Sequence, residues 1–186
     1  MNKSDQRDGG VFPRPGSVEH NFLFGDKIQK QKSLKRWKRL NKYVTIPLYK
    51  LGIFPLFGFG KMFLLLYTKG RKTGKMRTTP LEYRRKDGEV YVVAGRGGKA
   101  HWFNNLLANP DDVEVKIGFR KFPAKYELIE DVETKNQFFI WYVTKFPRDA
   151  KFLFGWNSKE DDPEEVDFTT FSSLIKLLKI KKKDTN

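Results

Sequence analysis

The chain has 186 residues, which favours one domain with a sizeable core. It contains no cysteine, and its two histidines, His20 and His101, lie far apart, so disulfides and thiolate chemistry are excluded and no metal site or histidine-based triad is expected. The net charge of +15 indicates a polyanionic partner, which can be nucleic acid, an acidic membrane or an anionic small molecule.

The N-terminal segment changes from polar to strongly basic. Residues 1–25 are rich in Asp, Gly, Pro and Arg, which predicts a flexible arm before a single domain over residues 26–186. Residues 27–43 hold many Lys and Arg but no acid, and apolar residues recur there at helical spacing. A basic amphipathic helix is therefore predicted over residues 26–45. It can bind an anionic membrane surface through residues 27–44 or pack its apolar side on the core.

The most apolar stretch, residues 46–67, is interrupted by Lys, Pro and Gly, so it makes a poor membrane-spanning helix. No secretory signal is recognisable before it. We therefore expect a cytoplasmic protein, peripheral to the inner face of the cell membrane if the basic helix binds lipid.

The region after residue 60 is dominated by short β-strand patterns. Strands are predicted over residues 62–68, 75–85, 89–94, 112–117, 122–130 and 174–180, with a tight Asp87-Gly88 turn between the second and the third. Helices are predicted over residues 99–108 and 133–145. This order indicates an α+β, mainly β fold, in which about six antiparallel strands form a barrel with peripheral helices.

Two glycine-containing loops carry cations at the ends of predicted strands. The first spans residues 70–77 (Gly-Arg-Lys-Thr-Gly-Lys-Met-Arg) and the second residues 95–98 (Gly-Arg-Gly-Gly). Neither has the spacing of a Walker A loop or of a dinucleotide-binding fingerprint. Backbone amides that glycine frees can bind an anion together with Lys and Arg. The two loops can therefore face one anion-binding cleft, or they can be ordinary solvated turns.

The predicted helix after the second loop places Trp102 and Asn105 three residues apart on one helical face. An indole and a carboxamide in this arrangement can cover a planar ring and form a hydrogen bond with it. They can equally be a core tryptophan and a capping asparagine.

Three motifs together resemble the deazaflavin-dependent nitroreductase and quinone reductase family. They are Leu-Leu-Leu-Tyr-Thr-x-Gly-Arg-Lys-Thr-Gly-x-x-Arg-x-x-Pro-Leu at residues 64–81, Val-Tyr-Val-Val-Ala-Gly-x-Gly-Gly at residues 90–98, and His-Trp-Phe-x-Asn-Leu-x-Ala-Asn-Pro at residues 101–110. The resemblance covers residues 47–130 well and the C-terminal third only loosely. It implies a split β-barrel that uses coenzyme F-420.

The resemblance also implies which residues bind the cofactor. The phosphodiester and oligoglutamate tail of F-420 would meet the glycine loops, and its ring would lie near the short helix. The positions that this assigns are Arg71, Lys72, Thr73, Arg77, Thr78, Arg96, Gly97, Gly98, Trp102 and Asn105. The reduced cofactor would transfer a hydride to a quinone-like, nitroaromatic or other conjugated acceptor, which would stack against Tyr142, Phe146 and Trp156.

The chain departs from the family pattern in two places. The segment before the tryptophan is compressed to residues 99–101, and the C-terminal region offers Phe146 and Phe152 where family members often have tyrosines. No side chain is thus assigned as a proton donor, and water can serve. No role is assigned to the acidic segment 159–167.

Two other functions are compatible with the sequence. One is a split barrel that binds FMN, and the other is a non-enzymatic barrel that binds anions or a membrane surface. Nucleic acid is not expected as a partner, because the cations cluster in glycine turns rather than between aromatic residues on a sheet face.

Overall fold

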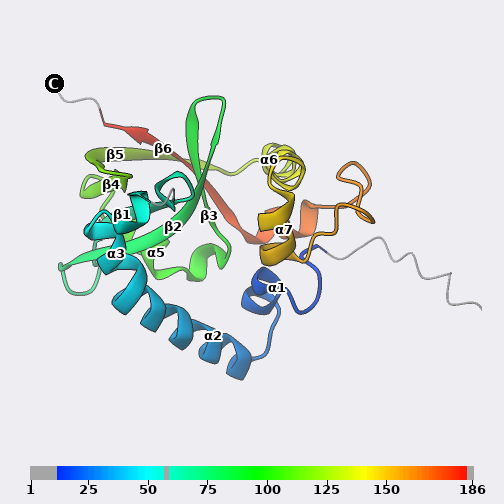
Figure 1. The fold of residues 1–186 in the computed structure, drawn as a ribbon, viewed down its shortest axis with the longest axis horizontal. Helices are drawn as coiled ribbons and strands as arrows, with labels where there is room; N and C mark the ends of the chain where they lie inside the picture. Colours follow the sequence, from blue (N-terminus) through cyan, green and yellow to red (C-terminus); the bar gives the residue numbers. More distant parts are fainter. Residues whose placement is uncertain (1–11, 57–58, 184–186) are drawn as a thin grey trace, which may run out of the picture.

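Six antiparallel strands close into a barrel in the order β1-β2-β3-β6-β5-β4 (Figure 1). The computed structural model describes residues 12–56 and 59–183. The strands are β1 (Phe63–Lys69), β2 (Met76–Lys86), β3 (Glu89–Ala94), β4 (Val113–Ile117), β5 (Arg120–Ile129) and β6 (Lys176–Lys182). The predicted barrel of about six strands is confirmed. Its last strand begins later than predicted, because residues Thr169–Leu174 form a helix first.

Helices surround the barrel on two sides (Figure 1). A long helical arm precedes β1, and the three helices α6, α7 and α8 lie between β5 and β6 in the chain. The α-helices are α1 (Val18–Leu23), α2 (Lys27–Leu40), α3 (Ile46–Lys50), α4 (Ile53–Leu56), α5 (His101–Ala108), α6 (Val132–Lys145), α7 (Pro147–Phe154) and α8 (Thr169–Leu174). A π-helix, Asn41–Thr45, joins α2 to α3, and short 3-10 turns cover Phe59–Lys61 and Gly97–Lys99. No helix of the described segments is both long and apolar enough to cross a membrane.

β6 separates two hydrophobic cores. Side chains alternate across a strand, so Leu178 points into the barrel, where it packs with residues of β1, β3, β4 and α5, while Leu177 packs among the helices outside. The outer core is largely aromatic and includes Phe138 and Phe139 of α6 and Phe154 of α7. The helical layer is therefore an integral part of the fold and not an appendage.

The first half of β2 lies open on one side. β2 pairs with β1 through Met76–Glu82 but with β3 only through Tyr83–Lys86. Pro80 lies in the half with one neighbouring strand, where its missing N–H group breaks no pairing with β3. This half of β2 borders the candidate site described below.

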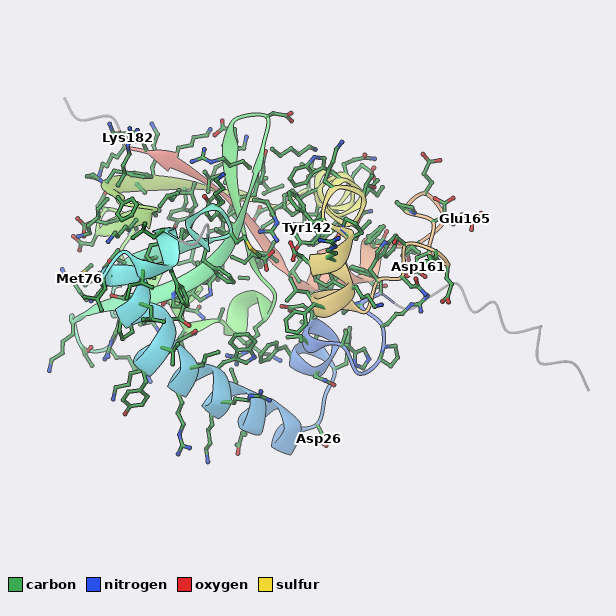
Figure 2. All side chains as sticks on the ribbon, viewed as in Figure 1. Asp26, Met76, Tyr142, Asp161, Glu165 and Lys182 are labelled. Carbon is green, nitrogen blue, oxygen red and sulfur yellow. The ribbon has the colours of Figure 1, made fainter. Side chains whose placement is uncertain are left out.

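Residues 12–25 of the predicted arm pack against the helical layer. Phe12 is only 5% exposed and meets Phe154, Phe168 and Phe171 with ring centroids 4.7–5.2 Å away. Arg14 pairs with Asp161 of the acidic segment, which lies beyond α7 in Figure 2. The acidic segment thus has a structural role that the sequence did not indicate. Residues 1–11 of the predicted arm lie outside the described residues.

We predict that Phe12→Ala lowers the free energy of unfolding by about 3–5 kcal/mol, because it empties a packed aromatic site. Phe152→Ala is the matched control, since Phe152 is 65% exposed on α7 and its removal leaves no cavity. Chemical denaturation measures both. Equal stability of the two variants would show that the N-terminal segment does not stabilise the helical layer.

Candidate functional site

A groove of about 990 Å³ lies between the first half of β2, the two glycine loops and the helical arm. Eight of the ten residues assigned to cofactor binding line it: Arg71, Lys72, Thr73, Arg77, Thr78, Arg96, Trp102 and Asn105. The tertiary structure therefore brings both loops and the α5 face to one cleft, as the sequence suggested. We call it the basic groove.

The first glycine loop is a compact turn that α5 holds in place. Thr73 and Gly74 donate their N–H groups to Gly70 O at 3.1 and 2.8 Å, and Gly74 has a φ of 65°, which favours glycine. Asn105 Oδ1 accepts a hydrogen bond from the backbone N–H of Arg71 at 3.3 Å. The carboxamide of Asn105 therefore positions the loop, in addition to lining the groove.

The cations of the basic groove have no partner of opposite charge among the residues that the structure describes. Arg77 makes a weak contact to Thr73 Oγ1 at 3.4 Å, but none of the groove's Lys or Arg residues forms an ion pair with another residue that the structure describes. The pKa of His101 at the rim is lowered by burial and by the surrounding cations. These are Lys38, Arg71, Arg96 and Lys72. Such a concentration of uncompensated positive charge suits an anionic ligand.

The second wall of the basic groove is the helical arm itself. Leu34, Trp37 and Lys38 of α2 and Asn41 of the π-helix line it. The sequence left open whether the apolar side of this helix meets a membrane or the core. The structure places Leu34 and Trp37 on the groove, so these two side chains cover a cleft instead of lying on an open face.

The two remaining predicted cofactor residues shape the loop rather than line the groove. Gly97 is buried with a φ of 52°, and a Cβ there would lie 2.3 Å from Leu174 O. Gly98 O accepts a 2.6 Å hydrogen bond from Asn104 Nδ2. The positive φ of Gly97 allows the chain to turn tightly into α5.

A smaller, aromatic cavity of about 300 Å³ continues from the basic groove. Glu19, Trp37, Pro80, Arg96 and Trp102 are among the residues that line both. Farther in, the smaller cavity is lined by Tyr91, Phe138, Phe139, Tyr142, Leu153 and Phe154. We call it the aromatic cavity. An anionic ligand in the groove can thus extend an uncharged ring toward a largely apolar chamber.

A buried ion network forms the floor of the aromatic cavity. Arg84, only 5% exposed, contacts Glu82 Oε1 and Asp149 Oδ2, each at 2.6 Å, and the Tyr142 hydroxyl donates to Glu82 Oε1 at 2.6 Å. Burial raises the pKa of Glu82, and the Arg84 charge opposes that shift. Burial and the nearby Glu82 carboxylate also raise the pKa of Tyr142. The network keeps this hydroxyl protonated and directed at Glu82.

Of the three predicted substrate-pocket residues, Tyr142 alone lines the aromatic cavity. Phe146 packs beneath the Arg84 guanidinium, which lies 4.5 Å from its ring centroid. Trp156 is 2% exposed and lies between Phe12 and Phe168 in the outer core. The assignment of Trp156 to the pocket is therefore corrected: its indole supports the helical layer and faces neither described cavity.

Glu19 of α1 is a site residue that sequence reasoning missed. It lies where the basic groove and the aromatic cavity meet, and its Oε2 atom is buried without a hydrogen-bond partner among the described residues. Burial, reinforced by Glu82, raises the pKa of Glu19 to about 7. The local sequence does not indicate that Glu19 is buried in the site, because Glu19 lies in a segment whose composition predicts a polar arm.

We predict that Arg84→Leu destabilises the protein by about 3–5 kcal/mol at pH 8, because it leaves the Glu82 carboxylate buried without its charge partner. The folded pKa of Glu82 would then rise further above its unfolded value, so stability falls as the pH rises through that range and the deficit shrinks in acid. Denaturation at pH 5 and pH 8 measures this.

Lys121→Leu is the control, since it removes an exposed ion pair with Glu114 that contributes less than about 1 kcal/mol. A deficit of the Arg84 variant that does not change between the two pH values would contradict the proposed role of the Glu82 charge.

Comparison with known proteins identifies related sequences. A family model described as F420H(2)-dependent quinone reductase matches residues 56–152, just over half of the chain. The F420H(2)-dependent quinone reductases Rv1261c and MT1299, from two strains of Mycobacterium tuberculosis, are each 49% identical over 63 residues. That alignment covers 32% of this chain and 41% of each relative, so the chain spans about two fifths of their length.

Solved structures with a related fold were also found. The structure titled F420-H2 Dependent Reductase (FDR-A) is 26% identical, with 65% of this chain and 95% of that chain covered and a TM-score of 0.43. The conserved hypothetical protein Rv2991 from Mycobacterium tuberculosis is 17% identical, with 70% and 78% covered and a TM-score of 0.47. The match of the family model over more than half of its residues shows that this chain belongs to the F420H(2)-dependent quinone reductase family.

Proposed function

We propose that this protein is an oxidoreductase that binds reduced coenzyme F-420 and passes a hydride from it to a conjugated acceptor. The observation that carries the proposal is the continuity of two unlike cavities. A groove lined by several cations opens into a chamber walled by aromatic rings. A ligand that has a polyanionic tail and a planar reactive ring matches both. Membership of the family supports the same assignment.

The basic groove fits the charged part of this cofactor. Arg71, Lys72 and Arg77 would bind its phosphodiester and carboxylates. Lys acts as a point charge, whereas Arg can donate two hydrogen bonds to one group in a bidentate arrangement. Arg96, at the junction with the aromatic cavity, would neutralise the charge closest to the ring, and Trp102 would cover the ring. When bound, the reduced deazaflavin supplies a hydride from its C5 atom.

The aromatic cavity fits the acceptor. Its volume of about 300 Å³ is at the lower end of the range for small-molecule sites, and it suits a single planar ring system. Aromatic walls from α6, α7 and β3 would stack on such a ring and exclude water. We propose an acceptor of the quinone, nitroaromatic or other conjugated class on these grounds.

FMN is the competing cofactor for a barrel of this type. It carries a single phosphate and so offers less negative charge than F-420. The row of groove cations extends from Arg96 to Lys72 and on to Lys38 and Lys42 across the cleft, which is more positive charge than one phosphate requires. A protein that merely binds anions would not need the aromatic cavity. We therefore favour F-420 over both alternatives.

We predict that F-420 binds the purified protein more tightly than FMN, with an affinity that falls as salt is added. Lys72→Ala or Arg77→Ala should each weaken F-420 binding by about 10- to 100-fold, because each removes a charge-assisted hydrogen bond. Cofactor fluorescence measures the affinity. Lys151→Ala, which changes an exposed cation on α7, is the control. Tighter binding of FMN, or equal affinities in all variants, would refute the assignment.

We also propose that the protein docks on an anionic membrane surface, from which it takes a lipophilic acceptor. The support is an exposed apolar ridge formed by Leu51, Leu56 and Phe119, which are 74%, 76% and 66% exposed. The Phe119 ring lies against Gly52, so the β4–β5 turn and the α3–α4 corner form one ridge. Exposed Lys50 and nearby cations suit acidic headgroups. The proposed docking residues therefore extend beyond the predicted range, 27–44.

The double variant Leu51→Glu/Leu56→Glu should reduce binding to anionic vesicles by about 10-fold or more, since it removes apolar insertion and adds repulsion. Co-sedimentation measures the bound fraction, and F-420 fluorescence checks that the groove is intact. Phe152→Glu, on α7, should bind vesicles as the wild type does. Equal binding of the two variants would show that the ridge is not the docking surface.

A further inference from the structure

We propose that the Glu19 carboxyl group is the proton donor to the acceptor that is reduced in the aromatic cavity. The proposal rests on the proposed function and adds to it a residue that neither the sequence motifs nor the family match assigns. A quinone that accepts a hydride becomes a hydroquinone only when an oxygen atom also gains a proton, so the site needs an acid at the acceptor.

The position of Glu19 suits this role. It lines both cavities, at the point where a ring held from the basic groove would meet a ring in the aromatic cavity. The backbone of Gly95 approaches the carboxyl group so closely that a Cβ on that glycine would lie 2.1 Å from Oε2. Oε2 is buried and has no hydrogen-bond partner among the described residues. The hydrogen-bonding capacity of this oxygen is therefore not used by any residue that the structure describes.

Burial and a neighbouring carboxylate keep a proton on Glu19 near neutral pH. Burial, together with the Glu82 carboxylate of β2, raises the pKa of Glu19 to about 7. Arg84 pairs with Glu82 and with Asp149 of α7, so its charge is already compensated. Arg96, from the β3–α5 loop, also lines both cavities. The other ionisable residues that line the basic groove are Lys38, Lys42, Arg71, Lys72, Arg77 and His101.

Other acids near the cavity are less suitable. The Tyr142 hydroxyl already donates a hydrogen bond to Glu82, and its pKa is raised by burial and by the Glu82 carboxylate. His101 does not line the aromatic cavity, and burial together with the groove cations lowers its pKa. A carboxyl group with a pKa near 7 combines a large protonated fraction with ready release of the proton.

The proposed step is balanced. The hydride brings two electrons and one proton from the reduced cofactor, which is oxidised, and the acceptor is reduced. The O–H bond of Glu19 breaks, a new O–H bond forms on the acceptor oxygen, and the carboxylate regains its proton from solvent. Arg96 at the same junction would stabilise the carboxylate until then.

The first experiment measures the acid itself, without cofactor or turnover. In protein labelled with carbon-13 at glutamate carboxyl groups, one resonance should titrate near pH 7 and should be missing from Glu19→Gln. Glu165→Gln, which changes an exposed carboxylate of the acidic segment shown in Figure 2, should retain it. A Glu19 resonance that titrates at the ordinary value near 4.5 would overturn the proposal.

The second experiment follows a single turnover of bound reduced F-420 with a soluble quinone. In wild-type protein the rate should fall as the pH rises through about 7, because the acid is lost. Glu19→Gln should bind F-420 with nearly wild-type affinity, lose about 100-fold in rate at pH 6 and lose that pH inflection. Gly95→Ala, which displaces the carboxyl group, should also slow the step, and Glu165→Gln should behave as the wild type.

The outcomes separate the two proposals. If wild-type protein does not bind F-420, the proposed function fails, and the role of Glu19 fails with it. If wild-type protein binds F-420 and turns over while Glu19→Gln keeps the same rate and pH profile, then the proposed function stands, water supplies the proton and the inference about Glu19 is refuted.

Discussion

The buried charge of Arg84 is the constraint on which the arrangement of this molecule depends. A guanidinium group cannot remain inside a protein without partners, and its partners here come from three elements: Glu82 from its own strand, Asp149 from α7 and, through Glu82, Tyr142 from α6. Satisfying this one charge holds the helical layer against β2. The aromatic cavity lies directly above that contact, so its walls stay in place because the network beneath it is complete.

The two cavities differ in charge and in polarity, and in our proposal they have different roles in the site. The basic groove lies at the solvent-facing edge, where its cations can remain hydrated until an anion binds, and it can provide binding energy and orientation. The aromatic cavity lies deeper, where low polarity raises the pKa values of Glu19 and Glu82. In our proposal, affinity therefore comes mainly from one part of the cleft and chemistry from the other.

Much of the basic groove could be predicted because its signals are local. A loop that contains glycines and cations indicates a tight turn and an anion site within a few residues. The strand patterns on either side of it place such a loop at an end of the barrel. The roles of the aromatic residues in the C-terminal third cannot be predicted in the same way. Tyr142 and Trp156 have similar sequence surroundings, yet one lines a cavity and the other fills the outer core. Tyr142 lies on α6 and Trp156 follows the end of α7, and only the packing of these two segments in the fold distinguishes their side chains.

By itself, the sequence determined the strands, their hairpins, the basic loops and the membership of a family that the motifs already suggested. These features follow from short-range periodicity, turn chemistry and charge. The tertiary structure decided what long-range contacts create: α2 as a wall of the groove, the acidic segment as the partner of Arg14, and Glu19 at the junction of two cavities. Burial is a property of the whole fold, so no pattern around Glu19 could have revealed that its carboxyl group is withdrawn from water.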